Sequence, residues 1–262
     1  MLDHYSGPAW FARQAKQLLY PRRCPYCRRV LGTLPRCVDC EPLLEELRRR
    51  PMRLDMDEHY LGGLDGAAAP YCYKGAVRYA ILRAKYEGES WTAVELGVEM
   101  AKQLFGAEVK MRFAEPTPCP PEQPILGYDC IVPVPATGRR RGYNVPERMA
   151  QPLARALGIP LFPHALCRIR AGKHQAGLPL DERLANVAGA FRAQEPETVE
   201  GKRVLLVDDV ITTGATAAAC AQALLSAGAE SVFAVAMAAV ETDESSLLTK
   251  NEIKYPEKSE KT

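Results

Sequence analysis

The feature that most constrains the fold is a short apolar run that ends in two acidic residues and leads at once into a glycine turn. The run covers residues 204–207, the acids are Asp208 and Asp209, and the stretch reads VLLVDDVITTGAT. Such a run is typical of a central parallel strand, and the alanine-rich sequence after Thr216 is typical of a helix. A strand that passes through a glycine turn into a helix predicts an α/β fold with a ligand site at the carboxyl end of the strand.

The second half of the chain alternates in the same way between apolar runs and helix-like spacing. We expect strands within residues 128–135, 158–170, 204–207 and 231–240, and helices within residues 145–158, 179–185 and 213–228. Residues 71–105 predict a strand or turn followed by one or two helices, with an interruption near residues 87–90. This alternation predicts a mostly parallel sheet with helices on both faces.

Asp208 and Asp209 place two carboxylates side by side where an open α/β sheet binds its ligand. Adjacent ionised carboxylates repel each other, and hydroxyl donors or a divalent cation relieve the repulsion, as a ribose diol with Mg²⁺ would. The turn after the acids adds hydroxyls and backbone N–H groups at a helix start, which is typical of a phosphate site. The expected phosphate-binding residues are Thr212, Thr213, Gly214, Ala215 and Thr216.

Each of these residues also has a simpler interpretation when it is taken singly. The two acids could end a strand, and Thr212 or Thr213 could cap a helix. The chain lacks the Gly-Lys-Ser/Thr ending of a Walker loop and the GxGxxG pattern of a dinucleotide site. The acids and the phosphate turn together therefore favour a sugar phosphate as the ligand.

A second stretch, PVPATGRRRGYN, joins the end of an expected strand to three consecutive arginines. Arginine binds phosphate oxygens in bidentate geometry, and the amides of a tight turn add donors, so we expect a pyrophosphate site here. The candidate residues are Ala136, Thr137, Arg139, Arg140 and Arg141. Arginines on a solvated turn would give the same pattern without a ligand.

A third stretch combines Lys173, His174 and Gln175 with flanking glycines. This composition suits a mobile loop that closes over a substrate and excludes water. His174 could act as a general base because its unperturbed pKa lies near 6.5, although a solvated loop histidine is the simpler interpretation.

Nine cysteines are present, and four of them form two CxxC pairs nine residues apart. Two such pairs can supply the four thiolates of a tetrahedral, structural Zn²⁺ site, so we expect Cys24, Cys27, Cys37 and Cys40 to be metal ligands. A redox pair or a disulfide is the alternative.

Charge is unevenly distributed along a chain whose formal net charge is only +2. Residues 133–192 hold ten Arg or Lys against three acids, and residues 1–53 hold eleven against five. Both regions predict anion-attracting surfaces, although a solvated face explains any one arginine equally well. No apolar run reaches eighteen residues and residues 1–24 lack the pattern of a secretory signal, so we expect no membrane span and a cytoplasmic location.

We expect the chain to divide into three parts. Residues 1–53 would hold a short helix and the cysteine module, residues 54–240 the α/β domain, and residues 241–262 a polar tail. Five prolines between residues 115 and 124 predict a loop, because proline lacks a backbone donor and blocks helix.

At every position, VLLVDDVITTGAT resembles the 5-phosphoribosyl-1-pyrophosphate (PRPP) motif of the type I phosphoribosyltransferases. The resemblance implies that Asp208 and Asp209 hold the ribose hydroxyls, that residues 212–216 bind the 5-phosphate, and that Mg²⁺ arrives with the pyrophosphate. Hypoxanthine-type enzymes carry an aspartate where Thr212 stands, so the resemblance disfavours purine salvage.

The order of motifs over residues 18–238 resembles the ComF family. The order is the four-cysteine module, YKGAVRYAILRAKYEG, the arginine turn, KHQAGLPLDERLANVAGAF and the acidic motif. The resemblance implies a zinc-ribbon-like module before a type I phosphoribosyltransferase-like α/β domain, and a role in DNA uptake for natural transformation (competence). It also implies single-stranded DNA as a ligand, with a DNA-uptake helicase and a recombination mediator as partners.

Two hypotheses about function follow. In one, the chain is a phosphoribosyltransferase whose acceptor is open, since the sequence holds no recognisable nucleobase-binding hood. In the other, the sugar-phosphate site acts as a sensor, and either the cysteine module or the arginine-rich face holds nucleic acid. Pyrophosphate release from PRPP and the salt dependence of DNA affinity separate the two.

Overall fold

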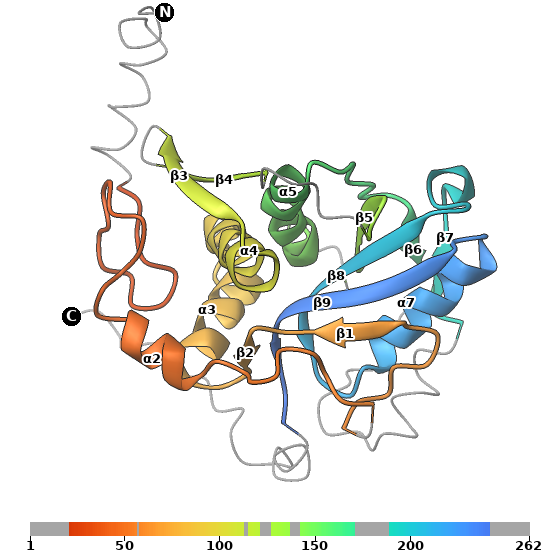
Figure 1. Ribbon diagram of the computed structural model, residues 1–262, viewed down its shortest axis with the longest axis horizontal. Helices are drawn as coiled ribbons and strands as arrows, with labels where there is room; N and C mark the ends of the chain where they lie inside the picture. The colour runs from red at the N-terminus through yellow and green to blue at the C-terminus, as the bar shows by residue number, and fades with distance from the viewer. Residues whose placement is uncertain are drawn as a thin grey trace, which may run out of the picture.

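The core of the protein is a parallel sheet between two layers of helices (Figure 1). The computed structural model describes residues 21–56, 58–112, 115–120, 127–136, 142–170 and 189–241, and all structural statements concern these residues. The strands of the main sheet are β1 (Gly66–Ala68), β2 (Tyr71–Cys72), β5 (Cys130–Pro133), β8 (Arg203–Ile211) and β9 (Ser231–Ala239). Their order is β1-β9-β8-β5, β2 also pairs with β9, and every pairing is parallel. The expected α/β class with a parallel sheet is confirmed.

Helices cover both faces of this sheet. On one face lie α3 (Gly75–Tyr86), α4 (Ser90–Phe105) and α5 (Val145–Leu157), and on the other lies α7 (Ala215–Ser226). Leu205 and Val207 of β8 pack in the core beside α3 to α5, while Val204 and Leu206 pack in the core beside α7. Because both faces of β8 are covered, the strand is apolar at every one of these positions, which explains the uninterrupted run in the sequence.

Helices α4 and α5 approach each other closely at Gly97. A Cβ atom at this position would lie 2.3 Å from the backbone oxygen of Met149, so only glycine fits the contact. Both helices end at a glycine in the left-handed region, Gly106 with φ 64° and Gly158 with φ 68°. Such glycines satisfy the last helical carbonyls without the steric cost of a side chain.

The expected proline loop is partly wrong, because Glu115–Cys119 forms strand β4 and pairs antiparallel with β3 (Glu108–Arg112). Pro116 and Pro118 are two residues apart on β4, so their backbone nitrogens point to the same side of the strand. The outer edge of a two-stranded ribbon needs no backbone donor, and prolines spaced by two residues are therefore compatible with it.

The expected strand region 158–170 does not contribute a full strand to the main sheet. Only Leu166–Arg168 is a strand, β6, and it pairs antiparallel with β7 (Phe191–Ala193) in a separate two-stranded sheet. Leu161 makes a single parallel bridge to Ile131 of β5. A short 3-10 helix, Pro196–Thr198, follows β7.

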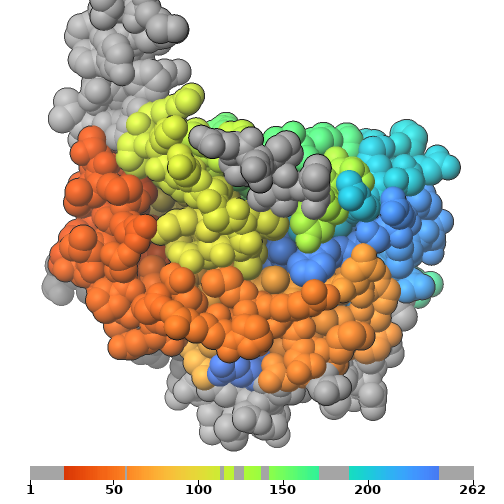
Figure 2. Space-filling model, viewed as in Figure 1, coloured from red at the N-terminus to blue at the C-terminus, as the bar shows by residue number. Residues whose placement is uncertain are grey.

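The cysteine module and the short helix α2 (Glu41–Glu46) lie against α3 and α4 at one side of the molecule. In Figure 2 the red and orange residues form a continuous band that runs from this module along the lower edge of the molecule. Arg48 and Arg53 already make backbone bridges to Tyr71 and Ala68, so the chain joins the α/β body before residue 53. The division into three parts stays a prediction.

None of the helices in the described ranges combines the length and the apolar character that crossing a bilayer requires. The helix expected within residues 10–20, the helix expected at 179–185 and the tail after residue 241 lie outside the described residues.

Candidate sugar-phosphate and metal sites

The two aspartates lie inside β8, and their side chains point to opposite faces of the sheet. The strand continues through both acids to Ile211, so the expectation that it ends at residue 207 is wrong. The ladder with β9 explains the extension, because Val210 and Ile211 still pair with Ala238 and Ala239. Alternation then directs Asp208 toward α7 and Asp209 toward α3.

Asp209 is buried, with 7% of its surface exposed, and forms an ion pair with Lys85 at the end of α3. The distance from Lys85 Nζ to Asp209 Oδ1 is 2.7 Å. Burial acts to lower the pKa of Lys85, but the attraction of Asp209 outweighs it and raises that pKa above its usual value. A buried carboxylate needs such a partner, because an isolated charge away from water is costly.

Asp208 has no cation of its own within ion-pair distance among the described residues. Its Oδ1 accepts the backbone N–H of Asp209 at 2.8 Å. Burial and the charge of Asp209 raise the pKa of Asp208 from 3.8 to about 7, against the opposing attraction of Lys85. Strongly raised carboxyl pKa values are typical of functional sites.

Lys85 is a site residue that the sequence analysis missed. The residue follows Val77 and Ile81 at intervals of four, and both of these are fully buried on the inner face of α3. A lysine on the apolar stripe of a helix requires a buried partner. This spacing was the only signal in the sequence that could have identified it.

The turn after β8 is fixed by backbone contacts with residues near Tyr60. Gly214 has φ 84°, and a Cβ atom there would lie 2.3 Å from the backbone oxygen of Tyr60. The backbone N–H of Tyr60 donates to the carbonyl of Thr213 at 2.8 Å. Glycine is required at this position for both reasons.

The start of α7 has the free donors that a phosphate site needs. The N-cap residue is Gly214 and no side chain caps the helix, so the simpler interpretation, in which Thr212 or Thr213 caps it, is wrong. The first backbone N–H groups of a helix have no intrahelical acceptor, and they attract anions. A groove of about 940 Å³ along α7 reaches this end of the helix at Ala215 and Tyr60.

The ends of the arginine turn lie beside the acid pair. β5 pairs with β8 so that Pro133 is opposite Val207, and the N–H of Val134 donates to the carbonyl of Val207 at 2.9 Å. The side chain of Asn144 donates to the carbonyl of Val134 at 2.9 Å and so closes the base of the turn. Ala136 lies within the described residues, whereas Thr137, Arg139, Arg140 and Arg141 lie outside them, as do Lys173, His174 and Gln175.

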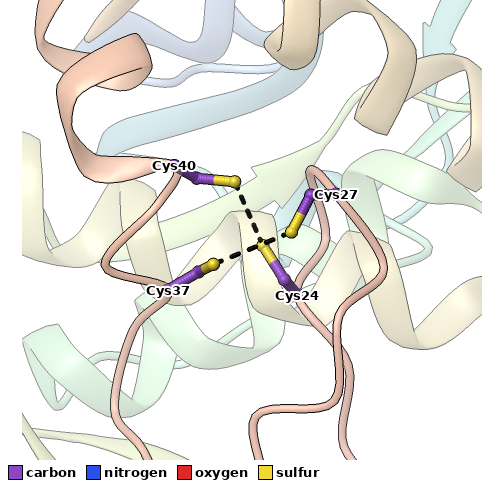
Figure 3. Close-up of side chains that lie close together, drawn as sticks. All are labelled: Cys24, Cys27, Cys37 and Cys40. Carbon is purple, nitrogen blue, oxygen red and sulfur yellow. Dashed lines mark hydrogen bonds between the residues drawn. The ribbon is translucent and has the colours of Figure 1, made fainter.

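The four cysteines of the two CxxC pairs converge on one point (Figure 3). Their sulfur atoms all lie within 4.8 Å of one another, with Cys24 to Cys40 at 3.8 Å and Cys27 to Cys37 at 3.7 Å. A tetrahedron of sulfurs about 2.3 Å from a zinc ion has edges of about 3.8 Å, so the cluster could hold a metal such as zinc. All four thiols are free, and these separations are far longer than a disulfide bond of about 2.05 Å.

The backbone supports the thiolate form at one of these cysteines. Burial acts to raise the pKa of Cys27, but the N–H of Arg29 and the neighbouring thiols bring it down to about 7. The N–H of Tyr26 donates to the sulfur of Cys24 at 3.4 Å. Metal binding would displace the remaining thiol protons.

Most arginines near the cysteine module already have acidic partners. Carboxylates lie within 4.0 Å of seven of them: Arg22, Arg28, Arg29, Arg36, Arg48, Arg49 and Arg50. Arg170 and Arg192, near the second sheet, are exposed and have no carboxylate partner among the described residues. The positive charge of the module is therefore largely balanced, which the sequence count alone did not show.

Comparisons with known proteins agree with this geometry. A family model described as phosphoribosyl transferase domain matches residues 146–255, which include the acid pair and the phosphate turn. The DNA utilization protein YhgH of Salmonella typhi is 36% identical over 141 residues, which cover 53% of this chain and 58% of that protein. The protein of the same name in Escherichia coli K12 is 42% identical over 107 residues, or 40% of this chain and 46% of that one.

Competence protein F of Haemophilus influenzae is 36% identical over 108 residues, which cover 40% of this chain and 47% of that protein. The chain thus matches about half the length of these relatives. Among solved structures, glutamine PRPP amidotransferase of B. subtilis is 24% identical with a TM-score of 0.32, covering 55% of this chain and 26% of that one. Residues 146–255 thus match the phosphoribosyl transferase domain, a four-cysteine cluster precedes them, and the similar proteins include ones named for DNA utilization and for competence.

Proposed function

We propose that this chain binds PRPP, or a related sugar phosphate, together with Mg²⁺, and that it acts with single-stranded DNA in DNA uptake or utilization. The observation that carries the first half is the position of the two motifs on neighbouring strands. The arginine turn leaves β5 at the residue bonded to Val207, which directly precedes the acid pair. A ligand that carries a pyrophosphate at one end, a diol in the middle and a phosphate at the other end matches the arginine turn, the acid pair and the start of α7 in that order.

Each group of this chain has a defined part in binding. Asp208 accepts hydrogen bonds from the ribose hydroxyls, and the free N–H groups at the start of α7 receive the 5-phosphate. Each charge-assisted hydrogen bond contributes roughly 1.5–3 kcal/mol, so a few of them can hold the phosphate without a lysine in the turn. Mg²⁺ would enter with the pyrophosphate and neutralise part of its charge.

The cysteine cluster would hold Zn²⁺ as a closed, structural site. Cys24, Cys27, Cys37 and Cys40 fill all four tetrahedral positions, which leaves no position for a water or a substrate. The module then supports the α/β domain and takes no part in the chemistry.

The names of the relatives support the second half of the proposal, as does the charge of the arginine-rich region. Arg170 and Arg192 are exposed on the β6–β7 side, and the guanidinium of Arg168 lies 5.3 Å from the centre of the Phe191 ring. Exposed arginines attract the phosphate backbone of single-stranded nucleic acid. We expect the DNA contacts on this face and not on the cysteine module.

Calorimetric titration of the full, zinc-loaded chain with PRPP and Mg²⁺ tests the sugar-phosphate site. The wild type is expected to bind and the Asp208→Asn variant to lose at least about tenfold in affinity. Absence of binding by the wild type at millimolar PRPP would remove the proposal.

Fluorescence anisotropy of a labelled oligothymidine across salt concentrations tests the DNA ligand, beside a pyrophosphate-release assay with PRPP. A steep salt slope without pyrophosphate release supports a binding protein. Release that depends on an added acceptor identifies a transferase, and a flat, weak DNA titration contradicts the DNA half.

A further inference from the structure

The last turn of α3 contacts three separate parts of the molecule through three consecutive residues. Arg83 donates to the backbone carbonyls of Pro25 and Tyr26, the latter at 3.0 Å. The carbonyl of Ala84 accepts the hydroxyl of Tyr143 at 2.5 Å, and Lys85 pairs with the buried acid of β8. This turn thus joins the first cysteine pair, the base of the arginine turn and the acid pair.

These contacts hold Lys85 in one place. Pro25 and Tyr26 lie between Cys24 and Cys27, so Arg83 binds the loop that presents two of the sulfurs. The guanidinium of Arg83 also lies 3.9 Å from Glu89 at the start of α4. These contacts fix the last turn of α3, and the aliphatic part of the Lys85 side chain lies on the buried face of this helix. The Lys85 side chain therefore has little conformational freedom.

The ion pair assigns different parts to the two aspartates. One oxygen of Asp209 is occupied by the ammonium of Lys85, whose side chain is 22% exposed while that of Asp209 is 9% exposed. Asp208 is half-buried and its carboxylate is not taken by a cation among the described residues. The acceptor left for a ligand is therefore Asp208.

The groups that face the two carboxyls come from several elements. They are Lys85 of α3, Cys220 of α7, the hydroxyl of Tyr73 before α3, and the carboxyls themselves. Within the described ranges Lys85 is the only cation among them, and its attraction lowers the pKa of Asp208 while burial and Asp209 raise it. Without Lys85 the pKa of Asp208 would be higher.

We propose that Lys85 is a positioning residue of the sugar-phosphate site: its ion pair holds the Asp209 carboxyl in place, so that Asp208 remains available to accept the hydroxyls of the ligand. Lys85 acts through Asp209 and does not itself touch the ligand. This inference rests on the proposed function, since it names how that site is kept in its binding form.

The experiment measures affinity for PRPP with Mg²⁺ by calorimetry in full-length, zinc-loaded protein, from pH 6 to pH 9. The variants are Lys85→Gln, Lys85→Arg and the double variant Lys85→Gln with Asp209→Asn. Lys110→Gln is the matched control, because it removes the same charge from an exposed position on β3. Any protonation of PRPP itself is the same for the wild type and every variant, so it cancels when their pH profiles of affinity are compared.

Lys85→Gln is expected to weaken binding by about ten- to a hundredfold, since a buried charge-assisted hydrogen bond is lost. The pH below which binding declines should also rise, from near 7 in the wild type to a higher value in this variant. Lys85→Arg should restore most of the affinity, and Lys110→Gln should change nothing. The double variant removes both partners and should show no upward change of the pH midpoint, because Asp208 then has no charged neighbour on the strand.

Equal affinity and an equal pH midpoint in Lys85→Gln and the wild type would overturn the inference while leaving the proposed function intact. So would a Lys85→Arg variant as impaired as Lys85→Gln, because a cation would then not be the requirement. A wild type that binds no PRPP overturns the proposed function and this inference with it. The double variant guards against misfolding, because it leaves neither member of the ion pair without its partner.

Discussion

Replacing Asp208 by Asn is expected to stabilise the fold and to weaken sugar-phosphate binding at least about tenfold. Burial and the charge of Asp209 raise the pKa of the Asp208 carboxyl from 3.8 to about 7. The folded-state pKa thus lies above that of the unfolded chain, so the ionised group destabilises the folded state, and this destabilisation grows as the pH rises from about 4 to about 7. At 1.36 kcal/mol per pH unit, the difference amounts to about 4 kcal/mol above pH 7.

Asparagine removes the charge and keeps the shape of the side chain. Its amide oxygen can still accept the N–H of Asp209, which Asp208 accepts at 2.8 Å. The gain in unfolding free energy is therefore expected to be about 2 kcal/mol at pH 5 and about 4 kcal/mol at pH 8. Urea denaturation of the full chain at both pH values, with and without PRPP and Mg²⁺, measures it.

Asp129 provides a control, because its replacement by Asn should change the stability of the fold in the opposite direction. Hydrogen bonds from Arg203 hold the pKa of Asp129 below its usual value, so its ionised form stabilises the fold above the unfolded-state pKa. Asp129→Asn should lower stability at pH 8, and this effect should shrink as the pH falls. An Asp208→Asn variant that is less stable than the wild type at pH 8, or whose gain does not change with pH, would refute the electrostatic account of the site.

Three further predictions concern the turn, the metal and the nucleic acid. Gly214→Ala should lower the unfolding free energy by at least about 2 kcal/mol in urea denaturation and remove PRPP binding, because of the left-handed backbone and the contact with Tyr60. One Zn²⁺ per chain should be released by a chromogenic chelator after thiol modification, and Cys37→Ser should reduce this stoichiometry and lower the thermal midpoint. Arg170→Gln should reduce the salt slope of single-strand DNA binding by about 0.7, while Arg29→Gln, which removes an arginine already paired in the cysteine module, should leave it unchanged in the same anisotropy titration.

The parts of the fold that were predictable from the sequence depend on local patterns. The apolar run of β8, the alanine-rich helix α7 and the two CxxC pairs each carry their signal within a single short stretch of sequence. The match of residues 146–255 to the phosphoribosyl transferase domain was predictable from the stretch around β8, because few ligands need paired acids directly before a glycine turn.

The features that were not predictable depend on partners far away in the sequence. The extension of β8 through the acids requires the ladder to β9, and the role of Lys85 requires a carboxylate 124 positions later in the chain (209 − 85). Strand β4 was missed because proline content was given more weight than proline spacing. The paired arginines of the cysteine module were missed because a count of charges does not show which carboxylates they contact.

The acid pair is best explained by ligand binding, because two carboxylates do not stabilise the sheet. Residues 204–207 show what a buried strand at this place needs, and an apolar residue at position 208 would continue that pattern opposite Ala236 of β9. The carboxylate of Asp208 instead raises the free energy of the folded chain, and the attraction of Lys85 offsets only part of this. A site that destabilises the fold at neutral pH, and that lies between the start of α7 and the base of the arginine turn, is consistent with the general trade of stability for binding. The same reasoning predicts that a saturating ligand restores stability, by about 2.7 kcal/mol at one hundred times its dissociation constant in the wild type, and by less at the same concentration in Asp208→Asn.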